Sequence, residues 1–283
     1  MSDQFINYNG NIISSTNPIL GLQNRAFKYG DGLFETIRVV NRKVMFADLH
    51  AKRLMQGMKL LKLENSNQFN SDFINQKISE LLISNSIYKD ARVRLSVFRN
   101  DGGFYSPESN DSLYALEVSN INYSGYQLNK KGLLITTYKG MQKPLSAYSG
   151  VKSSNALLYV LAGIEAKESG FDDLLILNST GNIAETISSN IFIVKNEKIY
   201  TPALSEGGID GVMRKAIISL AKKEKISLTE TIISVENLLL ADEIFLTNAI
   251  QGVQWVMGYG AKRYFNKTSK LLTDYLNNHS LNG

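Results

Sequence analysis

The chain has 283 residues, of which 43% are hydrophobic and 20% are charged, and its formal net charge is +5. These values are typical of a globular protein that is long enough for two modest domains. No apolar run approaches the roughly 20 residues that span a membrane. The absence of cysteine excludes disulfides, thiolate catalysis and zinc–thiolate sites.

The basic residues are scattered along the chain. The tightest group, Lys222-Lys223-Glu224-Lys225, includes an acid and lies near the end of a predicted helix, where cations suit the helix dipole. We therefore expect no nucleic-acid partner, although a modest positive field would attract anionic substrates. The N-terminus has neither a basic start nor an apolar stretch, so we expect no secretory signal, no membrane association and a cytoplasmic location.

The first 120 residues predict strands and two helices. Turn dipeptides Asn9-Gly10 and Asn41-Arg42 predict hairpins, the first over 5–8 and 11–13 and the second over 33–40 and 43–46. Helical spacing of apolar residues predicts helices at about 48–61 and 72–84, with an asparagine-rich loop at 65–70 between them. Alternation predicts strands at 91–98 and 113–118.

Residues 119–127 are polar and rich in turn formers, which predicts a first domain over 1–120, a linker over 121–127 and a second domain over 128–283. In the second domain, the sequence predicts strands at 133–138, 173–177, 186–195, 198–200 and 243–246, and helices at about 154–169 and 211–224. This order predicts an α+β, two-domain protein. Its N-terminal α/β domain is the smaller, and its C-terminal domain is mixed β/α.

Two familiar motifs are absent or incomplete. Gly30-Asp31-Gly32 is not a dinucleotide-binding loop, because Glu35 occupies the third glycine position and no βαβ unit surrounds it. The only histidines are His50 and His279, and neither arrangement suggests a nucleophile partner or a metal site.

Four separated segments are informative together: 25–38 (RAFKYGDGLFETIR) with 50–54 (HAKRL), 150–155 (GVKSSN), 181–192 (GNIAETISSNIF), and 208–214 (GIDGVMR) with 246–249 (LTNA). In these motifs and their order, over nearly the whole length, the chain resembles the class IV aminotransferases, which are the fold-type IV pyridoxal-phosphate enzymes. The resemblance implies a D-amino acid aminotransferase-like fold, an enzyme that uses pyridoxal 5′-phosphate on a small-molecule substrate, and a homodimer with the site near the subunit interface.

Lys152 follows a Ser-Gly loop and precedes a predicted helix. We expect the apolar face of that helix to anchor the lysine to the core; the face comprises Ala156, Leu157, Val160, Leu161 and Ile164. A lysine that forms a Schiff base must be deprotonated part of the time, and burial or nearby cations lower its pKa. In isolation, such a loop lysine is ordinarily a surface charge. The resemblance implies that Lys152 is the catalytic Schiff-base lysine.

Glu185 stands at the head of a predicted strand, where a carboxylate is most often solvated. The resemblance implies that it is the partner of the cofactor's ring nitrogen, because a protonated pyridine withdraws electrons better.

The glycine-rich run at 207–211 leads into a predicted helix, whose first backbone N–H groups, at Val212 and Met213, form a natural anion site. An ordinary glycine turn is the alternative. The resemblance implies that these amides, with the backbone of Asn248 and Ala249, hold the cofactor's phosphate.

The resemblance also implies roles for residues near the N-terminus. Arg53, in the His-x-x-Arg-Leu element, would contact the phosphate, with a helix-surface salt bridge as the alternative. Tyr29 and Phe34 flank the Gly-Asp-Gly turn and would line the substrate pocket, although core packing is the alternative. Arg99 corresponds to a substrate-carboxylate arginine in some members, and a solvated loop arginine is its alternative.

Three activities are compatible with the family: branched-chain transamination, D-amino acid transamination and 4-amino-4-deoxychorismate lysis. All use the lysine as a proton shuttle. The runs at 208–214 and 247–249 look more like the lyases, and Ala156 replaces a tyrosine of many branched-chain enzymes. The element at 30–38 occurs in both groups, and some lyases carry threonine where Glu35 stands.

We therefore expect a 4-amino-4-deoxychorismate lyase of folate biosynthesis, which releases pyruvate and leaves p-aminobenzoate. A branched-chain or D-amino acid aminotransferase is the alternative. A catalytically silent binding protein is the alternative of another class, and the presence of both Lys152 and Glu185 disfavours it.

Overall fold

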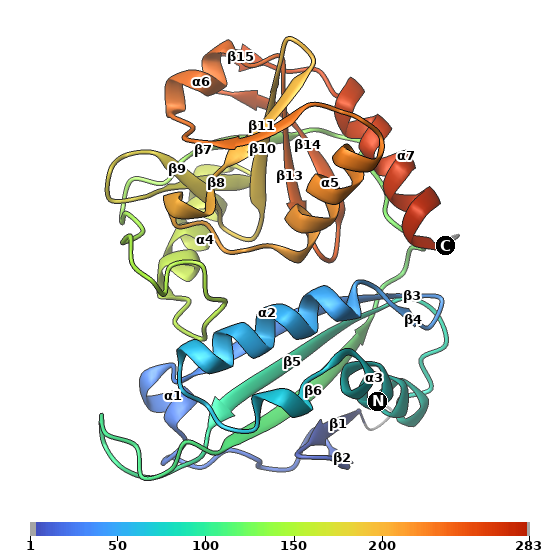
Figure 1. Ribbon diagram of the computed structural model, residues 1–283, viewed down its shortest axis with the longest axis vertical. Helices are drawn as coiled ribbons and strands as arrows, with labels where there is room; N and C mark the ends of the chain where they lie inside the picture. The colour runs from blue at the N-terminus through green and yellow to red at the C-terminus, as the bar shows by residue number, and fades with distance from the viewer. Residues whose placement is uncertain (1–3, 282–283) are drawn as a thin grey trace. The chain divides into compact units, whose positions relative to one another are not determined.

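The structure is a computed structural model that describes residues 4–281. The chain forms two compact units (Figure 1). Unit 1 comprises the chain up to Gly125 together with Val151–Asn155, and unit 2 comprises Tyr126–Gly150 and the chain from Ala156 onward. The first changeover falls inside the polar segment 119–127. The segment Val151–Asn155, which the sequence analysis assigns to the second domain, packs with unit 1.

Unit 1 is built on one antiparallel sheet of six strands, in the order β2-β1-β6-β5-β3-β4. The strands are β1 (Phe5–Tyr8), β2 (Asn11–Ser14), β3 (Gly32–Val40), β4 (Lys43–Val44), β5 (Ala91–Arg99) and β6 (Ser112–Asn120). Both predicted hairpins are confirmed. Asn9 and Gly10 adopt φ values of 48° and 91°, the left-handed conformation that such tight turns require.

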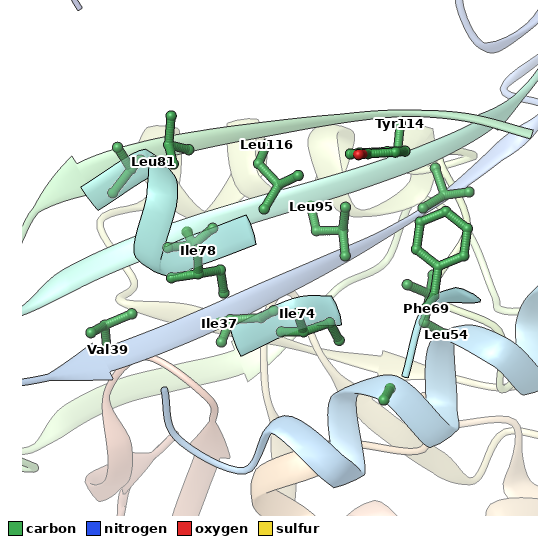
Figure 2. Close-up of a cluster of buried hydrophobic side chains, with 14 of the residues drawn as sticks. Ile37, Val39, Leu54, Phe69, Ile74, Ile78, Leu81, Leu95, Tyr114 and Leu116 are labelled. Carbon is green, nitrogen blue, oxygen red and sulfur yellow. The ribbon is translucent and has the colours of Figure 1, made fainter. Parts of the chain in front are cut away.

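The helices of unit 1 are α1 (Arg25–Tyr29), α2 (Ala47–Leu60), η1 (Ser66–Gln68) and α3 (Ser71–Ser84). The two long helices confirm the predictions, whereas the short α1 was not predicted. Asn70 caps α3 by accepting a hydrogen bond from the backbone N–H of Phe73 at 2.9 Å. One side of α3 carries Ile74, Ile78 and Leu81 toward the strands, where they pack into the core with residues such as Leu95 (Figure 2).

Unit 2 contains a mixed sheet of nine strands, in the order β12-β11-β10-β13-β14-β7-β8-β9, with β15 paired to β14. The strands are β7 (Leu133–Thr137), β8 (Asp173–Leu177), β9 (Ile183–Thr186), β10 (Asn190–Lys195), β11 (Lys198–Pro202), β12 (Leu228–Thr231), β13 (Glu243–Asn248), β14 (Gly252–Tyr259) and β15 (Lys262–Arg263). The pairs β11–β12, β14–β7 and β7–β8 are parallel, and the others are antiparallel. The predicted α+β class is therefore confirmed.

The helices of unit 2 are α4 (Leu157–Ser169), η2 (Leu204–Glu206), α5 (Val212–Lys223), α6 (Val235–Leu240) and α7 (Lys267–Leu281). The helices α6 and α7 and the strands β12, β14 and β15 were not predicted from the sequence. No helix within the described residues is long and apolar enough to cross a membrane.

Two predicted elements of unit 2 are wrong in detail. The helix expected from Ser154 begins at Leu157, because Ser153 and Ser154 are paired with the start of β3. The strand expected over 186–195 is two strands, β9 and β10. The chain turns between them, where the Thr186 N–H donates to the Ser189 carbonyl at 2.8 Å and the Thr186 hydroxyl donates to Asp173 at 2.9 Å.

The predicted anchoring of α4 by its larger apolar residues is also wrong. Its small residues Ala162 and Ala166 are buried, whereas Leu157 and Ile164 are 65% and 49% exposed. Val160 and Leu161 share this exposure. The helix is apolar on most sides. Its small residues allow it to pack closely against β8, and the larger side chains on its other sides remain exposed.

Candidate active site

Lys152 lies in unit 1, on a segment that continues the sheet at the edge of β3. The Phe34 N–H donates to the Lys152 carbonyl at 3.1 Å, and the Ser154 N–H donates to the Gly32 carbonyl at 2.9 Å. Leu33 and Ser153 form an antiparallel bridge. This pairing fixes the backbone of Lys152 on both sides, so the lysine is not on a loose loop.

The side chain of Lys152 is half-buried and lies against Phe34. Its Nζ is 4.3 Å from the centre of the Phe34 ring, and the guanidinium carbon of Arg94 is 3.8 Å from the same ring centre. Two cations on one aromatic ring are each attracted by its negative face. Phe34 therefore brings Lys152 together with an arginine that the sequence analysis did not select.

Arg94 lies on β5, on the sheet face that carries Phe34, because the register pairs Thr36 with Arg94 and Phe34 with Ser96. Its Nε donates to the Ser96 hydroxyl at 3.2 Å, and it lies 3.7 Å from the largely exposed Glu117. The guanidinium is thus partly open to solvent. The period-2 alternation of β5 was a signal that Arg94 faces away from the core, but it did not indicate Phe34.

Arg53 lies inside unit 1, on α2, and it is paired with Glu35 of β3. Its Nε donates to Glu35 Oε1 at 2.8 Å, and its Nη2 donates to Oε2. The helix-surface alternative is wrong, because Glu35 is fully enclosed and Arg53 is 9% exposed. The predicted contact of Arg53 with a phosphate stays a prediction.

His50 completes this buried cluster. Its Nδ1 lies 2.6 Å from Glu35 Oε2, and its Nε2 is buried without a hydrogen-bond partner among the described residues. Burial lowers the pKa of His50 below its usual value, and the charges of Arg53 and Lys152 add to this effect against the opposing pull of Glu35. His50 is therefore neutral near pH 7, with its Nδ1–H donating to Glu35.

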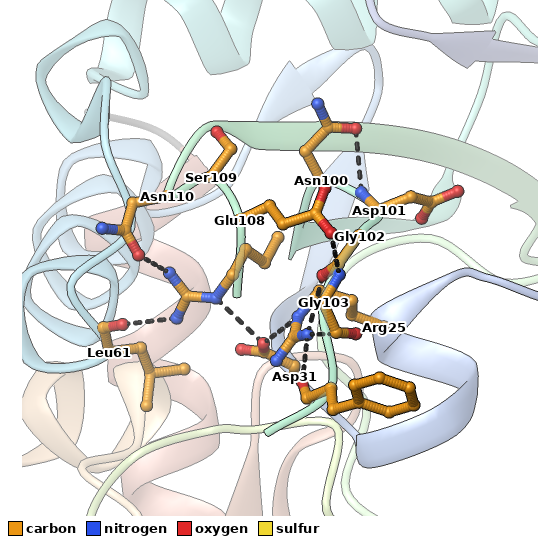
Figure 3. Close-up of polar contacts among 12 residues, drawn as sticks. Arg25, Asp31, Leu61, Asn100, Asp101, Gly102, Gly103, Glu108, Ser109 and Asn110 are labelled. Carbon is orange, nitrogen blue, oxygen red and sulfur yellow. Dashed lines mark hydrogen bonds and ion pairs between the residues drawn. The ribbon is translucent and has the colours of Figure 1, made fainter. Parts of the chain in front are cut away.

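Arg99 is part of a network that fastens the loops beside the Gly-Asp-Gly turn. Asp31 accepts hydrogen bonds from Arg99 Nε and Arg25 Nε, each at 2.9 Å. Figure 3 shows Asp31 beside Arg25. The other donors of Arg99 reach the carbonyls of Leu61 and Lys62 and the amide oxygen of Asn110. Its role as a substrate-carboxylate partner stays a prediction.

Tyr29 ends α1 and faces the same loop. The guanidinium carbon of Arg25 is 5.0 Å from the centre of its ring, and the ring of Tyr105 is 5.5 Å away from it. Tyr29 is half-buried, so its aromatic face is partly available.

Glu185 lies in unit 2, on β9, and it is 3% exposed. Three donors converge on its carboxylate. Lys143 Nζ and the Tyr159 hydroxyl each lie 2.5 Å from Oε1, and the Ile209 N–H donates to Oε2 at 2.9 Å. Burial and the nearby Glu185 carboxylate raise the pKa of Tyr159, so its hydroxyl keeps its proton. Neither Lys143 nor Tyr159 was predicted from the sequence.

The glycine-rich loop at 207–211 ends at α5, whose N-cap residue Gly211 makes no side-chain cap hydrogen bond. The first N–H groups of the helix, at Val212 and Met213, are therefore not capped by a side chain there. Asn190 fixes the loop, because its Nδ2 donates to the Ile209 carbonyl at 2.8 Å. A Cβ added to Gly211 would overlap Asn190 Oδ1, so a larger residue would have to displace the Asn190 side chain that holds the loop.

Asn248 ends β13 and Ala249 follows it; β13 pairs with β10 so that Thr247 lies opposite Asn190. Asn248 Nδ2 donates to the Ser189 hydroxyl at 3.0 Å, and its Oδ1 accepts from the N–H groups of Ile250 and Gln251. Both segments that are predicted to bind the phosphate, the loop before α5 and the end of β13, are therefore hydrogen-bonded to the neighbouring residues Asn190 and Ser189. An uncapped helix start beside polar groups is suited to an anion such as a phosphate.

A metal site is not indicated. Among residues 4–281, no group of three or more histidine, aspartate or glutamate side chains could hold a metal ion.

Comparison with known proteins identifies the family. The family model described as amino-transferase class IV matches residues 32–257. The chain is 30% identical to the aminodeoxychorismate lyase of Vibrio harveyi over 246 residues, which are 85% of this chain and 87% of the relative. It is 26% identical to the branched-chain-amino-acid aminotransferase of Escherichia coli K12 over 253 residues, which are 86% of this chain and 81% of the relative.

A solved structure of an aminotransferase from Brucella abortus, bound to the cofactor PLP, has the same fold. Its TM-score is 0.87 at 23% identity, over 98% of this chain and 99% of that one. The chain therefore belongs to the class IV aminotransferase family, and the predicted D-amino acid aminotransferase-like fold is confirmed.

Proposed function

We propose that this chain is a pyridoxal-phosphate-dependent 4-amino-4-deoxychorismate lyase, which releases pyruvate and forms p-aminobenzoate. The observation that carries this proposal is the 30% identity to the Vibrio harveyi lyase over 85% of the chain. The small residues Ala156 and Ala249 are compatible with it, because they leave room for a ring substrate.

The residues of unit 2 fit pyridoxal phosphate. The uncapped start of α5 suits the phosphate, and Gly208 and Gly211 admit no side chain, because an added Cβ would lie 2.6 Å from the Ala184 carbonyl or 1.8 Å from Asn190. Glu185 suits a protonated ring nitrogen, because a carboxylate offers about four acceptor sites and three donors reach it.

We assign the roles accordingly. Lys152 attaches the cofactor and carries the proton during the reaction. Glu185 holds the proton of the ring nitrogen, while the amides of Val212, Met213, Asn248 and Ala249, with Arg53, hold the phosphate. The bound cofactor supplies an electron sink for the substrate carbon that loses its proton. Elimination then forms an aromatic ring, so no oxidant is needed.

We assign substrate binding to unit 1 residues around Phe34. Arg94 suits a substrate carboxylate better than Arg99 does, because it lies on the same ring as Lys152 and is partly open to solvent, whereas Arg99 is committed to loop contacts. Tyr29 and Phe34 contribute aromatic walls.

We further propose a homodimer. The exposed apolar stripe of α4 supports it, because a monomer rarely leaves so many large aliphatic side chains of one helix in water. The stripe comprises Leu157, Val160, Leu161 and Ile164.

The test is a comparison of products. The cofactor-loaded protein is incubated with aminodeoxychorismate, and p-aminobenzoate and pyruvate are quantified; parallel reactions contain leucine or D-alanine with 2-oxoglutarate. Lys152→Ala is the control. The proposal expects equal amounts of both lyase products and slow or absent transamination.

The alternative is a branched-chain or D-amino acid aminotransferase, and the similarity to the Escherichia coli enzyme supports the branched-chain activity. Strong transamination without p-aminobenzoate would establish that alternative and reject the lyase. A protein that binds the cofactor and turns over none of these substrates would favour a binding function.

A further inference from the structure

Lys143 is a buried lysine of unit 2 that the roles above do not use. It is 7% exposed, and it is the one lysine among the buried residues that the structure describes. Its backbone is fastened on both sides: its N–H donates to the Leu177 carbonyl at 2.8 Å, and its carbonyl accepts from the Ser179 N–H at 3.0 Å. The ammonium is therefore held in place and does not extend from a mobile surface loop.

The partner of Lys143 is the carboxylate assigned to the cofactor's ring nitrogen. Lys143 Nζ lies 2.5 Å from Glu185 Oε1 and 5.6 Å from the centre of the Tyr159 ring. An ammonium and a carboxylate that are both buried are costly to keep charged unless they are paired. The pairing offsets this cost for both groups, and the Tyr159 hydroxyl donates to the same oxygen.

The arrangement of donors on Glu185 is asymmetric. Oε1 accepts from Lys143 and Tyr159, whereas Oε2 accepts from the Ile209 N–H alone. Each carboxylate oxygen has two acceptor sites. Oε1 is therefore filled, and one acceptor site remains on Oε2.

We propose that Lys143 is a positioning residue for the cofactor: with Tyr159 it fixes Glu185 in its ionised form and leaves one acceptor site of Oε2 for the ring nitrogen's proton. This inference rests on the proposed role of Glu185. Lys143 does not touch the ring in this account, and it acts through the carboxylate alone.

The first experiment needs no cofactor. The unfolding free energy of the cofactor-free protein is measured by denaturant titration from pH 5.5 to 8.5 for wild type, Lys143→Met, Lys143→Arg and Lys139→Met. Lys139 is an exposed lysine of the same loop and serves as the matched control. If Lys143→Met does not fold, Lys143→Gln replaces it, because glutamine is also neutral.

Without the ammonium, Glu185 is expected to bind a proton in the folded state that it does not bind when unfolded. The folding equilibrium constant of Lys143→Met, relative to wild type, should therefore fall by up to about tenfold per pH unit as pH rises. Lys143→Arg and Lys139→Met should run parallel to wild type. The neighbouring acids Asp173 and Asp210 contact Thr186 and Lys215 in every variant, so their contribution cancels in the comparison. Parallel curves for Lys143→Met would overturn the inference.

The second experiment tests the open site on Oε2. Affinity is measured for pyridoxal phosphate and for its 1-deaza analogue, which has carbon in place of the ring nitrogen. Wild type should prefer pyridoxal phosphate by about tenfold, the range of a hydrogen bond to a charged group. Lys143→Met should lose most of this preference, and Lys143→Arg should retain it.

The outcomes distinguish a failure of this inference from a failure of the proposed function on which it rests. An unchanged preference in Lys143→Met would make Lys143 a purely structural cation and overturn the inference. Equal affinity of wild type for both compounds would instead reject Glu185 as the partner of the ring nitrogen, and the pH experiment would still decide whether Lys143 keeps Glu185 ionised.

Discussion

Arg53 and Glu35 are joined by two hydrogen bonds inside unit 1, with Nε donating to Oε1 at 2.8 Å and Nη2 donating to Oε2. The carboxylate also accepts from His50. Burial alone would raise the pKa of Glu35, but the charge of Arg53 and the hydrogen bonds of Arg53 and His50 outweigh it and lower the pKa to about 2. Glu35, which belongs to the motif at residues 30–38, therefore also stabilises the fold.

Glu35→Gln should therefore reveal a pH-dependent loss of stability. Because the folded pKa is depressed, the contribution of Glu35 is complete above about pH 4.5 and is lost as pH falls toward 2. The shift corresponds to about 3 kcal/mol. Denaturant titrations should show a large deficit of the variant at pH 7 that shrinks at pH 3. A deficit that is constant with pH would contradict the ion-pair account.

Asp173→Asn should stabilise the protein at neutral pH. Burial raises the pKa of Asp173 to about 6, so its stability contribution is greatest below about pH 4 and falls as pH rises through 6. Asparagine keeps an acceptor for the N–H groups of Leu174 and Ile187. The gain should be about 1–3 kcal/mol at pH 8. Thermal melts at pH 5 and 8 measure it, with the exposed Asp274→Asn as control; equal gains for both variants would refute the prediction.

Gly211→Ala should weaken cofactor binding. Its Cβ would lie 1.8 Å from Asn190 Oδ1 and would displace the loop that Asn190 fixes before α5. We expect at least about a tenfold loss of affinity, the value of one hydrogen bond to a charged group. Gly163→Ala is the control, because its Cβ meets nothing within 4 Å inside α4. Normal affinity in Gly211→Ala would exclude this loop from the phosphate site.

The variants Arg94→Met and Arg99→Met should affect different properties of the protein, the first substrate binding and the second stability. Loss of Arg94 should raise the KM for aminodeoxychorismate about ten- to a hundredfold, the range of a charge-assisted contact, with a smaller change in kcat and little change in stability. Loss of Arg99 should instead lower the melting temperature, because it removes one of the two arginines that pair with Asp31 and the donor of two loop carbonyls. The reverse pattern would restore Arg99 as the carboxylate partner.

The parts of the fold that depend on local chemistry could be predicted from the sequence. The hairpin at Asn9-Gly10 follows from the backbone preferences of two residues, and α3 follows from the spacing of its apolar residues and its asparagine cap. The start of α4 could not be predicted, because Ser153 and Ser154 pair with β3, which is about 120 residues earlier in the chain. The break at residues 187–189 depends on Asp173 in another strand.

The residues of the candidate site also differ in whether the sequence could indicate them. Lys152, Glu185 and the glycine loop lie in motifs of consecutive residues, so the family resemblance could indicate them. Lys143 lies 42 residues from Glu185, and Arg94 meets Phe34 only through the register of β3 and β5. No local pattern marks such pairs, because the folded chain alone brings them together.

The central claim is that Lys152 is the residue that attaches the cofactor. The most direct measurement is borohydride reduction of the protein loaded with pyridoxal phosphate, followed by mass spectrometry of its peptides. The account predicts one phosphopyridoxyl group per chain, on Lys152, and none on the buried Lys143. Modification of Lys143 or another lysine in place of Lys152, or an unchanged yield in Lys152→Ala, would contradict it.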